Sequence, residues 1–126
     1  MKAVTREWVE KAEADHAAAI LMRRSRKKHS RDIVCFHLQQ CVEKYLKACL
    51  EEAGVTFPKT HDLERLLDLV LPTEPMWVSL RPAMASITAY AVEVRYPGRT
   101  VASAEANALL RDANHIRELI RSALGL

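Results

Sequence analysis

One arginine stands where the chain is forced to turn. Arg95 is followed directly by Tyr96, Pro97 and Gly98, a run that ends a helix and favours a tight turn. A guanidinium held at a turn, close to the start of the next helix, is suited to binding a phosphate or a carboxylate group. The alternative is a structural arginine that ties the turn to Asp15 or to helix ends. We treat Arg95 and Tyr96 as candidate ligand-binding residues.

Two further polar residues stand where the apolar pattern does not require them. Asp15 falls on the apolar side of the first expected helix, and burying a carboxylate is costly unless it is paired. It therefore needs a partner, for which Arg95 is one candidate, or it belongs to a polar site between helices. His61 follows Thr60, and we expect it either to accompany helix capping with an exposed imidazole or to line the same site.

A polar stripe runs opposite the broad apolar arc of the second expected helix. The stripe consists of Gln40, Glu43, Lys44, Lys47 and Glu51. In one interpretation it is a solvated face with a Glu43–Lys47 pair at i,i+4, worth about 0.3–0.5 kcal/mol. In the other interpretation it lines a groove and presents Gln40, Lys44 and Lys47 to a ligand.

Positive charge is concentrated in one short segment, although the net charge of the chain is only +3. The basic residues of this segment are Arg23, Arg24, Arg26, Lys27, Lys28 and Arg31. One interpretation is a nucleic-acid patch that contacts phosphates, whose affinity would fall steeply with salt. The other is a solvated, mobile loop. We expect the segment to lie away from the site at Arg95.

Helices must position these residues, and the few glycines and prolines predict where the helices end. Thr5 is expected to cap the first helix, which fades in the basic segment over residues 23–29. The second helix is expected to run from Ser30 to about Ala53, with Gly54 placed as its left-handed terminator.

Three more helices complete the expected fold. They are a short helix capped by Thr60, a fourth helix that starts near Ser79 or alternatively at Thr73 and ends at Arg95, and a last helix from Thr100 or Val101 to about Leu124. No segment alternates with a period of two for long enough to form a strand. We therefore expect an all-α protein, an up-and-down bundle of four main helices plus one short helix, in a single domain over residues 1–126.

Composition and spacing exclude several classes of function. The hydrophobic content of 49% excludes disorder, and no apolar run approaches the ~18 residues of a membrane span. A cytoplasmic protein without membrane contact is expected. Cys35, Cys41 and Cys49 form no CxxC pair and share the apolar side of one helix, so we expect free thiols that fill the core. No metal-ligand spacing, P-loop or dinucleotide motif is present, so no metal or cofactor is expected.

Four segments, in this order and spacing, resemble those of a known family. They are EWVEKAEAD, CFHLQQCVEKYLKACLEEAG, THDLERLL and ITAYAVEVRYPG, and they cover nearly the whole chain. The chain resembles the HEPN family, the higher-eukaryote and prokaryote nucleotide-binding domains. The resemblance implies a bundle of four or five helices that commonly forms a homodimer. The apolar residues Phe36, Leu110 and Leu119, expected on exposed faces, are consistent with a dimer.

The resemblance implies two kinds of function, and the sequence departs from one of them. The resemblance implies that many HEPN proteins are metal-independent endoribonucleases, whose motif is an arginine followed by four to six residues and then a histidine, near the start of the last helix. Arg95 matches the arginine, but Thr100, Val101 and Ala102 occupy the places of the histidine, so the motif is incomplete. Two arginines of the basic segment precede His29 at a permitted spacing, but that region is not where the family keeps its site.

Other family members are partners of small nucleotidyltransferases. We therefore expect a homodimeric nucleotide- or RNA-binding module that partners a minimal nucleotidyltransferase in a toxin–antitoxin-like or defence pair. Its expected ligand-binding residues are Arg95, Tyr96, Asp15, His61, Gln40, Lys44 and Lys47. The alternatives are a metal-independent endoribonuclease toxin with a divergent active site, for which Arg95 is the candidate catalytic residue, and RNA binding through the basic segment at residues 23–31.

Overall fold

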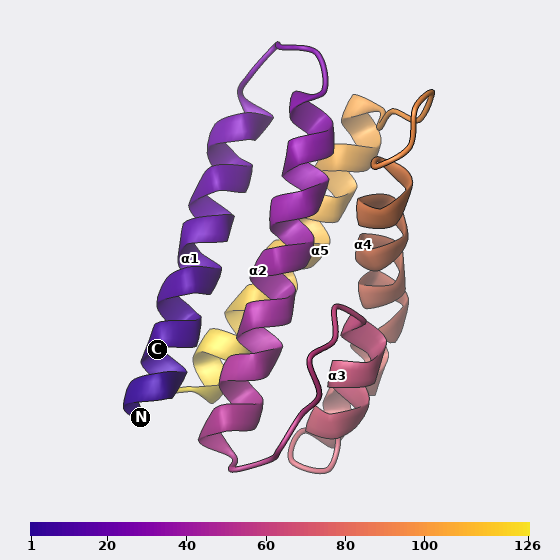
Figure 1. Cartoon of the computed structure of the whole chain (residues 1–126). Coiled ribbons are helices and arrows are strands. Elements are labelled where there is room, and N and C mark those ends of the chain that lie inside the picture. Colours follow the sequence, from indigo (N-terminus) through magenta and orange to yellow (C-terminus); the bar gives the residue numbers. More distant parts are fainter.

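The computed structural model describes all of residues 1–126 and confirms an all-helical bundle. Its elements are α1 (Ala3–Arg23), α2 (Ser30–Glu52), α3 (Leu63–Val70), the 3-10 helix η1 (Pro75–Leu80), α4 (Arg81–Glu93) and α5 (Ser103–Ala123). In Figure 1, α1 and α2 form a long antiparallel hairpin, and α4 and α3 follow one another along the other side of α2. The central helix α2 contacts every other α-helix, so the positions of all functional side chains are set relative to it.

The core is built on the apolar arc of α2. Leu38, Tyr45 and Leu46 are fully buried, and they belong to one cluster of 26 buried apolar residues contributed by all the helices. The three cysteines are free thiols that fill this core, as the sequence predicts: two are buried and Cys49 is partly buried. Burial raises the pKa of Cys41 to about 12, so this thiol stays protonated and unreactive near neutral pH. None of the helices combines the length and the apolar character that a membrane span needs.

Two of the predicted helix caps are wrong. Helix α1 begins at Ala3, so Thr5 lies inside its first turn, fully buried, where its hydroxyl donates a 2.9 Å hydrogen bond to the Glu52 carboxylate. Asp62 rather than Thr60 caps α3, because its carboxylate accepts a 3.0 Å bond from the Glu64 backbone N–H. In α3 the Asp62 carboxylate, two residues after Thr60, reaches the unpaired backbone groups, whereas the N-cap of α1, Lys2, makes no side-chain capping bond.

The other helix ends agree more closely with the sequence. Helix α2 ends at Glu52, and Gly54 has the predicted left-handed backbone, with a φ of +70°. Helix α4 begins at Arg81, close to the favoured start, so that Pro82 falls in the first turn where a missing N–H costs nothing. Helix α5 begins later than predicted, at Ser103, and Val101 in the segment before it is buried.

A carboxylate on α1 ties the bundle together at half height. Glu13 accepts a two-pronged bond from Arg117 on α5, at 2.6 and 2.7 Å, and a 2.6 Å bond from the Tyr45 hydroxyl on α2. These donors, the Arg117 bond above all, lower the pKa of the Glu13 carboxyl from 4.5 to about 2. The charged form therefore stabilises the contact of α1 with both α2 and α5.

Replacing Glu13 with glutamine should destabilise the fold in a way that depends on pH. Because the folded pKa lies below the unfolded one, the contribution of the carboxylate is complete above pH 4.5 and is lost as the pH falls toward 2. At pH 7 we expect Glu13→Gln to lower the free energy of unfolding by about 1–3 kcal/mol. Thermal melts at pH 7, 5 and 3 should show the two proteins converging as the pH falls; an equal gap at pH 7 and pH 3 contradicts this role.

Candidate functional site

Two connections of the bundle meet at one end and enclose a hollow. The α1–α2 connection and the α4–α5 connection both lie at the end of the bundle where α5 begins (Figure 1). The hollow between them has a volume of about 620 Å³. We call it the basic hollow. Its lining residues are Arg23, Ser25, Arg26, Lys27, Lys28, His29, Ser30, Arg31, Gly98, Arg99 and Thr100.

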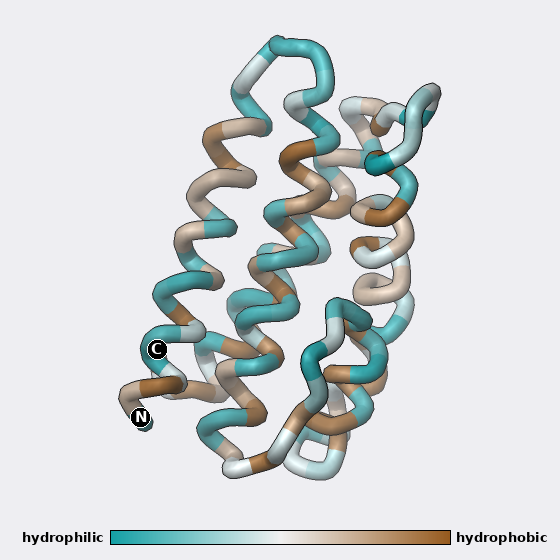
Figure 2. The backbone as a smooth tube through the Cα atoms, viewed as in Figure 1, coloured by the Kyte–Doolittle hydropathy of each residue, from teal (hydrophilic) through white to brown (hydrophobic).

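The basic hollow carries positive charge that nothing in its lining neutralises. Six of its eleven residues are arginine or lysine, and none is acidic or hydrophobic. Figure 2 shows the α1–α2 connection as one of the most hydrophilic stretches of the chain. Cations gathered in a concave surface raise the local potential and attract anions, and a bound anion relieves their mutual repulsion. The lining is therefore suited to phosphate groups.

A network of hydrogen bonds holds the two connections in place. The Arg23 guanidinium donates to the Asn107 amide oxygen at 2.7 Å and to the Ser103 hydroxyl at 2.6 Å, which joins the end of α1 to the start of α5. Ser30, which is 4% exposed, donates to the backbone oxygen of Lys27 at 2.8 Å and so closes the α1–α2 connection on itself. The remaining cations are left free to face a ligand.

One histidine of the basic hollow is held in a fixed orientation. His29 is the only residue other than glycine with a positive φ, +66°, a conformation that costs energy and favours a defined placement. Its Nδ1 lies 2.9 Å from the Asp32 carboxylate, whose other oxygen is buried without a partner. In the neutral ring this contact selects the tautomer protonated on Nδ1, which leaves Nε2 as a hydrogen-bond acceptor.

Arg95 and Tyr96 lie on the same α4–α5 connection as Arg99. Both are exposed, and the Arg95 side chain makes no hydrogen bond or ion pair. The expectation that the basic segment lies away from this turn is wrong, because Arg99 and Thr100 line the hollow together with that segment. The two candidate surfaces suggested by the sequence thus belong to one end of the molecule.

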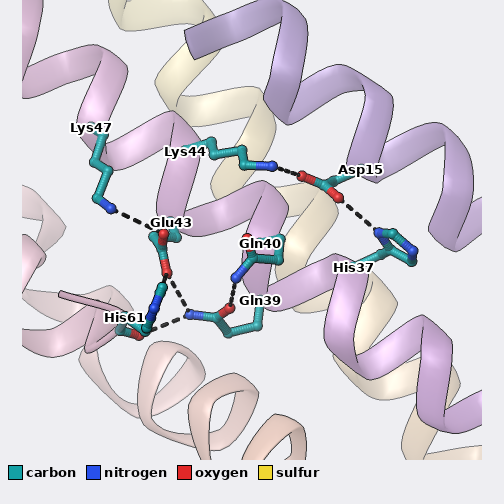
Figure 3. A network of polar contacts seen from close by, with 8 residues as sticks. All are labelled: Asp15, His37, Gln39, Gln40, Glu43, Lys44, Lys47 and His61. Carbon is teal, nitrogen blue, oxygen red and sulfur yellow. Dashed lines mark hydrogen bonds and ion pairs between the residues drawn. The ribbon is translucent and has the colours of Figure 1, made fainter. Parts of the chain in front are cut away.

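The predicted partner of Asp15 is also wrong. Asp15 is 8% exposed, and its carboxylate accepts from His37 at 2.7 Å and from Lys44 at 2.5 Å, both on α2 (Figure 3). Arg95 takes no part in this contact. A buried carboxylate with a lysine and an imidazole has the compensation that burial requires, so Asp15 chiefly joins α1 to α2.

Glu43 is the centre of a second buried group on α2. It is 3% exposed and contacts Lys47 at 3.0 Å, His61 at 2.9 Å and Gln39 at 3.1 Å (Figure 3). The predicted Glu43–Lys47 pair is confirmed, but it does not lie on a solvated face, because Lys47 is 7% exposed. Gln40 donates to the Gln39 oxygen at 2.8 Å. This group fastens the segment before α3 to α2.

The predicted ligand-binding residues therefore fall into two places. Asp15, Gln40, Lys44, Lys47 and His61 lie along α2 in the two groups of Figure 3, largely occupied by one another and by their neighbours. Arg95 and Tyr96 lie at the basic end, and no hydrogen bond or ion pair joins them to the first five.

Three residues at these places were not predicted. His37 lies seven residues before Lys44, a spacing that returns to the same helix face, and this signal could have found it. Gln39 could not have been found in this way, because its second partner, the His61 backbone oxygen at 2.8 Å, belongs to a loop. Arg99 gave no signal, because only the packing of the two connections brings it to the hollow.

The sequence of this chain matches one family model almost from end to end. The match is to the HEPN domain and spans residues 5–123. No curated protein and no solved structure matches the chain. The order of helices agrees with the bundle that the resemblance implied. The chain belongs to the HEPN domain family.

Proposed function

We propose that the protein is a cytoplasmic, homodimeric HEPN module that binds nucleotide or RNA phosphates in the basic hollow and partners a minimal nucleotidyltransferase in a toxin–antitoxin-like or defence pair. The observation that carries the binding proposal is the hollow itself, with six cations and no acidic residue in its lining. Membership of the HEPN family supports a nucleotide- or RNA-related role. The nucleotidyltransferase partner rests on the family resemblance alone.

The chemistry of the lining favours an RNA strand over a single nucleotide. None of the lining residues is hydrophobic or, apart from His29, aromatic, so the hollow offers little surface on which a base could stack. Its cations are spread over two connections and match several phosphates better than one. Tyr96 is 62% exposed on the α4–α5 connection and can stack on an unpaired base beside Arg95.

Removing two cations from the hollow should weaken RNA binding and its salt dependence together. For Lys27→Gln/Lys28→Gln we expect at least a tenfold loss of affinity for single-stranded RNA, and a slope of log K against log salt that is less steep by about 1.4. Arg95→Ala should also weaken binding without lowering the melting temperature, because the Arg95 side chain is exposed and makes no hydrogen bond or ion pair. Fluorescence anisotropy of a labelled oligonucleotide between 50 and 200 mM salt measures both quantities.

A matched variant controls for the loss of charge alone. Arg6→Gln/Lys11→Gln removes two exposed cations from α1 outside the hollow and should leave both affinity and slope close to those of the wild type. If the two double variants lose affinity equally, the hollow is not the binding surface. An affinity of the wild type that is insensitive to salt leads to the same conclusion.

Of the three apolar residues that the sequence offered for a homodimer interface, only Phe36 is exposed. Leu110 and Leu119 are partly buried against the core, so they do not form the exposed face that was expected. Phe36 is 43% exposed, and Ile33, one turn earlier on α2, is 42% exposed. These two side chains form an apolar strip that a second copy of the chain can cover.

Placing a charge on this strip should dissociate the dimer. We expect Phe36→Glu to sediment as a monomer at micromolar concentration with an unchanged helical spectrum, because a buried unpaired carboxylate is costly at an interface. Val78→Glu, at a 55% exposed position on η1, is the control and should remain dimeric. A wild type that is monomeric at this concentration overturns the dimer, and a dimeric Phe36→Glu variant overturns this interface.

A second candidate function is metal-independent RNA cleavage, which the orientation of His29 favours. With Asp32 holding Nδ1, the Nε2 atom can accept the proton of a 2′-hydroxyl as that oxygen attacks the neighbouring phosphorus. The 5′-oxygen leaves with a proton from water, and the cations around it stabilise the charge of the transition state. The products are a 2′,3′-cyclic phosphate and a 5′-hydroxyl.

Cleavage is tested with RNA in the presence of EDTA. If this candidate is correct, the wild type cleaves and His29→Gln loses at least about a hundredfold in rate, the usual size of a general-base contribution, while RNA affinity stays within about twofold. A wild type that leaves RNA intact rejects the candidate. So does a His29→Gln variant that cleaves at the wild-type rate.

A further inference from the structure

A second cleft lies at the end of the bundle opposite the basic hollow. The first turns of α1 and the start of the loop that follows α2 lie at the same end of the bundle as the N-terminus (Figure 1), and they line a cleft of about 530 Å³. We call it the aromatic cleft, and its lining residues are Lys2, Trp8, Lys47, Glu51, Gly54, Val55, Thr56, Phe57 and Lys59. Its size falls within the range of small-molecule sites.

Two aromatic rings form one wall of the aromatic cleft. Trp8 and Phe57 meet edge to face, with ring centroids 6.3 Å apart and planes at 64°. Both side chains are only partly buried, although each packs against the core on its inner side. Trp8 also lines an adjoining hollow of about 210 Å³, so its indole is accessible from more than one side. The wall is a fixed apolar surface of the kind on which a planar ring stacks.

The charges around the wall are predominantly positive. The Lys47 ammonium lies 5.5 Å from the centroid of the Trp8 ring, but its charge is largely balanced by Glu43. The Lys2 ammonium donates to the backbone oxygen of Glu51 at 2.9 Å, and the Lys2 backbone N–H donates to the Glu52 carboxylate at 3.0 Å. Lys59 is exposed and makes no hydrogen bond or ion pair. The only acidic side chain in the lining is that of Glu51.

We propose that the aromatic cleft binds a small planar aromatic anion, with its ring against Trp8 and Phe57 and its phosphate or carboxylate on Lys59 and Lys2. The ring of such a ligand has no comparable surface in the basic hollow, because the lining of the hollow contains no hydrophobic residue. The aromatic cleft and the basic hollow are thus two sites of different chemistry at opposite ends of the bundle.

The fluorescence of Trp8 reports on this site directly. The chain has two tryptophans, so the conservative variant Trp77→Phe leaves Trp8 as the only one. We expect AMP, nicotinate or both to quench its fluorescence saturably, and the stronger of the two identifies the anionic group. Adenosine lacks the phosphate of AMP, and ribose 5-phosphate lacks its aromatic base. Each should bind at least about fivefold more weakly than AMP, since each loses one of the two contacts.

Two substitutions in the Trp77→Phe background complete the test, because one removes a positive charge from the aromatic cleft and the other removes a negative charge. Lys59→Gln should weaken AMP binding roughly three- to fivefold, the scale of an exposed charge contact, and Glu51→Gln should strengthen it by a similar factor. Lys28→Gln, in the basic hollow, should change nothing at the aromatic cleft. The proposal is overturned if neither AMP nor nicotinate quenches saturably up to millimolar concentration, if either half of AMP binds as well as the whole, or if Lys28→Gln has a larger effect than Lys59→Gln.

Discussion

The basic end of the molecule depends on the bonds of one cation. Arg23 donates to Ser103 and Asn107 and thereby holds the end of α1 against the start of α5. Without this bridge the two cationic connections would repel one another, since like charges 4 Å apart cost about 1 kcal/mol in water and about 4 near a protein surface. By placing one positive charge in fixed hydrogen bonds, the fold can keep five others, including Arg99, facing a common space.

The treatment of charge differs sharply between the middle of the bundle and its end. Along α2 every buried carboxylate has cationic or imidazole partners: Asp15 has Lys44 and His37, and Glu43 has Lys47 and His61. At the basic end the cations have no such partners in the hollow lining. Cations that repel one another lower the stability of a fold. A negatively charged ligand that binds between them relieves this repulsion and stabilises the folded chain. This contrast is the reason to place phosphate binding at the end and a structural role in the middle.

The sequence predicted the bundle because apolar spacing and helix-ending residues act locally. Gly54 and Pro82 lie where their backbone preferences require, and the burial of Asp15 followed from its place on an apolar face. Its partner could not be predicted, because contacts between helices depend on their rotation and register, which spacing within one helix does not determine. The same limit hid the hollow: Arg99 joins the basic segment only because α5 starts beside the end of α1.

Hydrogen–deuterium exchange with and without single-stranded RNA tests most directly whether two separate connections form one phosphate-binding site. The backbone amides of residues 23–31 and of residues 98–100 should slow together when RNA is added, over the same range of RNA concentration, because both line the basic hollow. Residues 54–59, at the opposite end, should exchange at an unchanged rate. Slowing confined to residues 23–31, with residues 98–100 unaffected, would contradict the account, because the RNA would then lie on the basic loop alone.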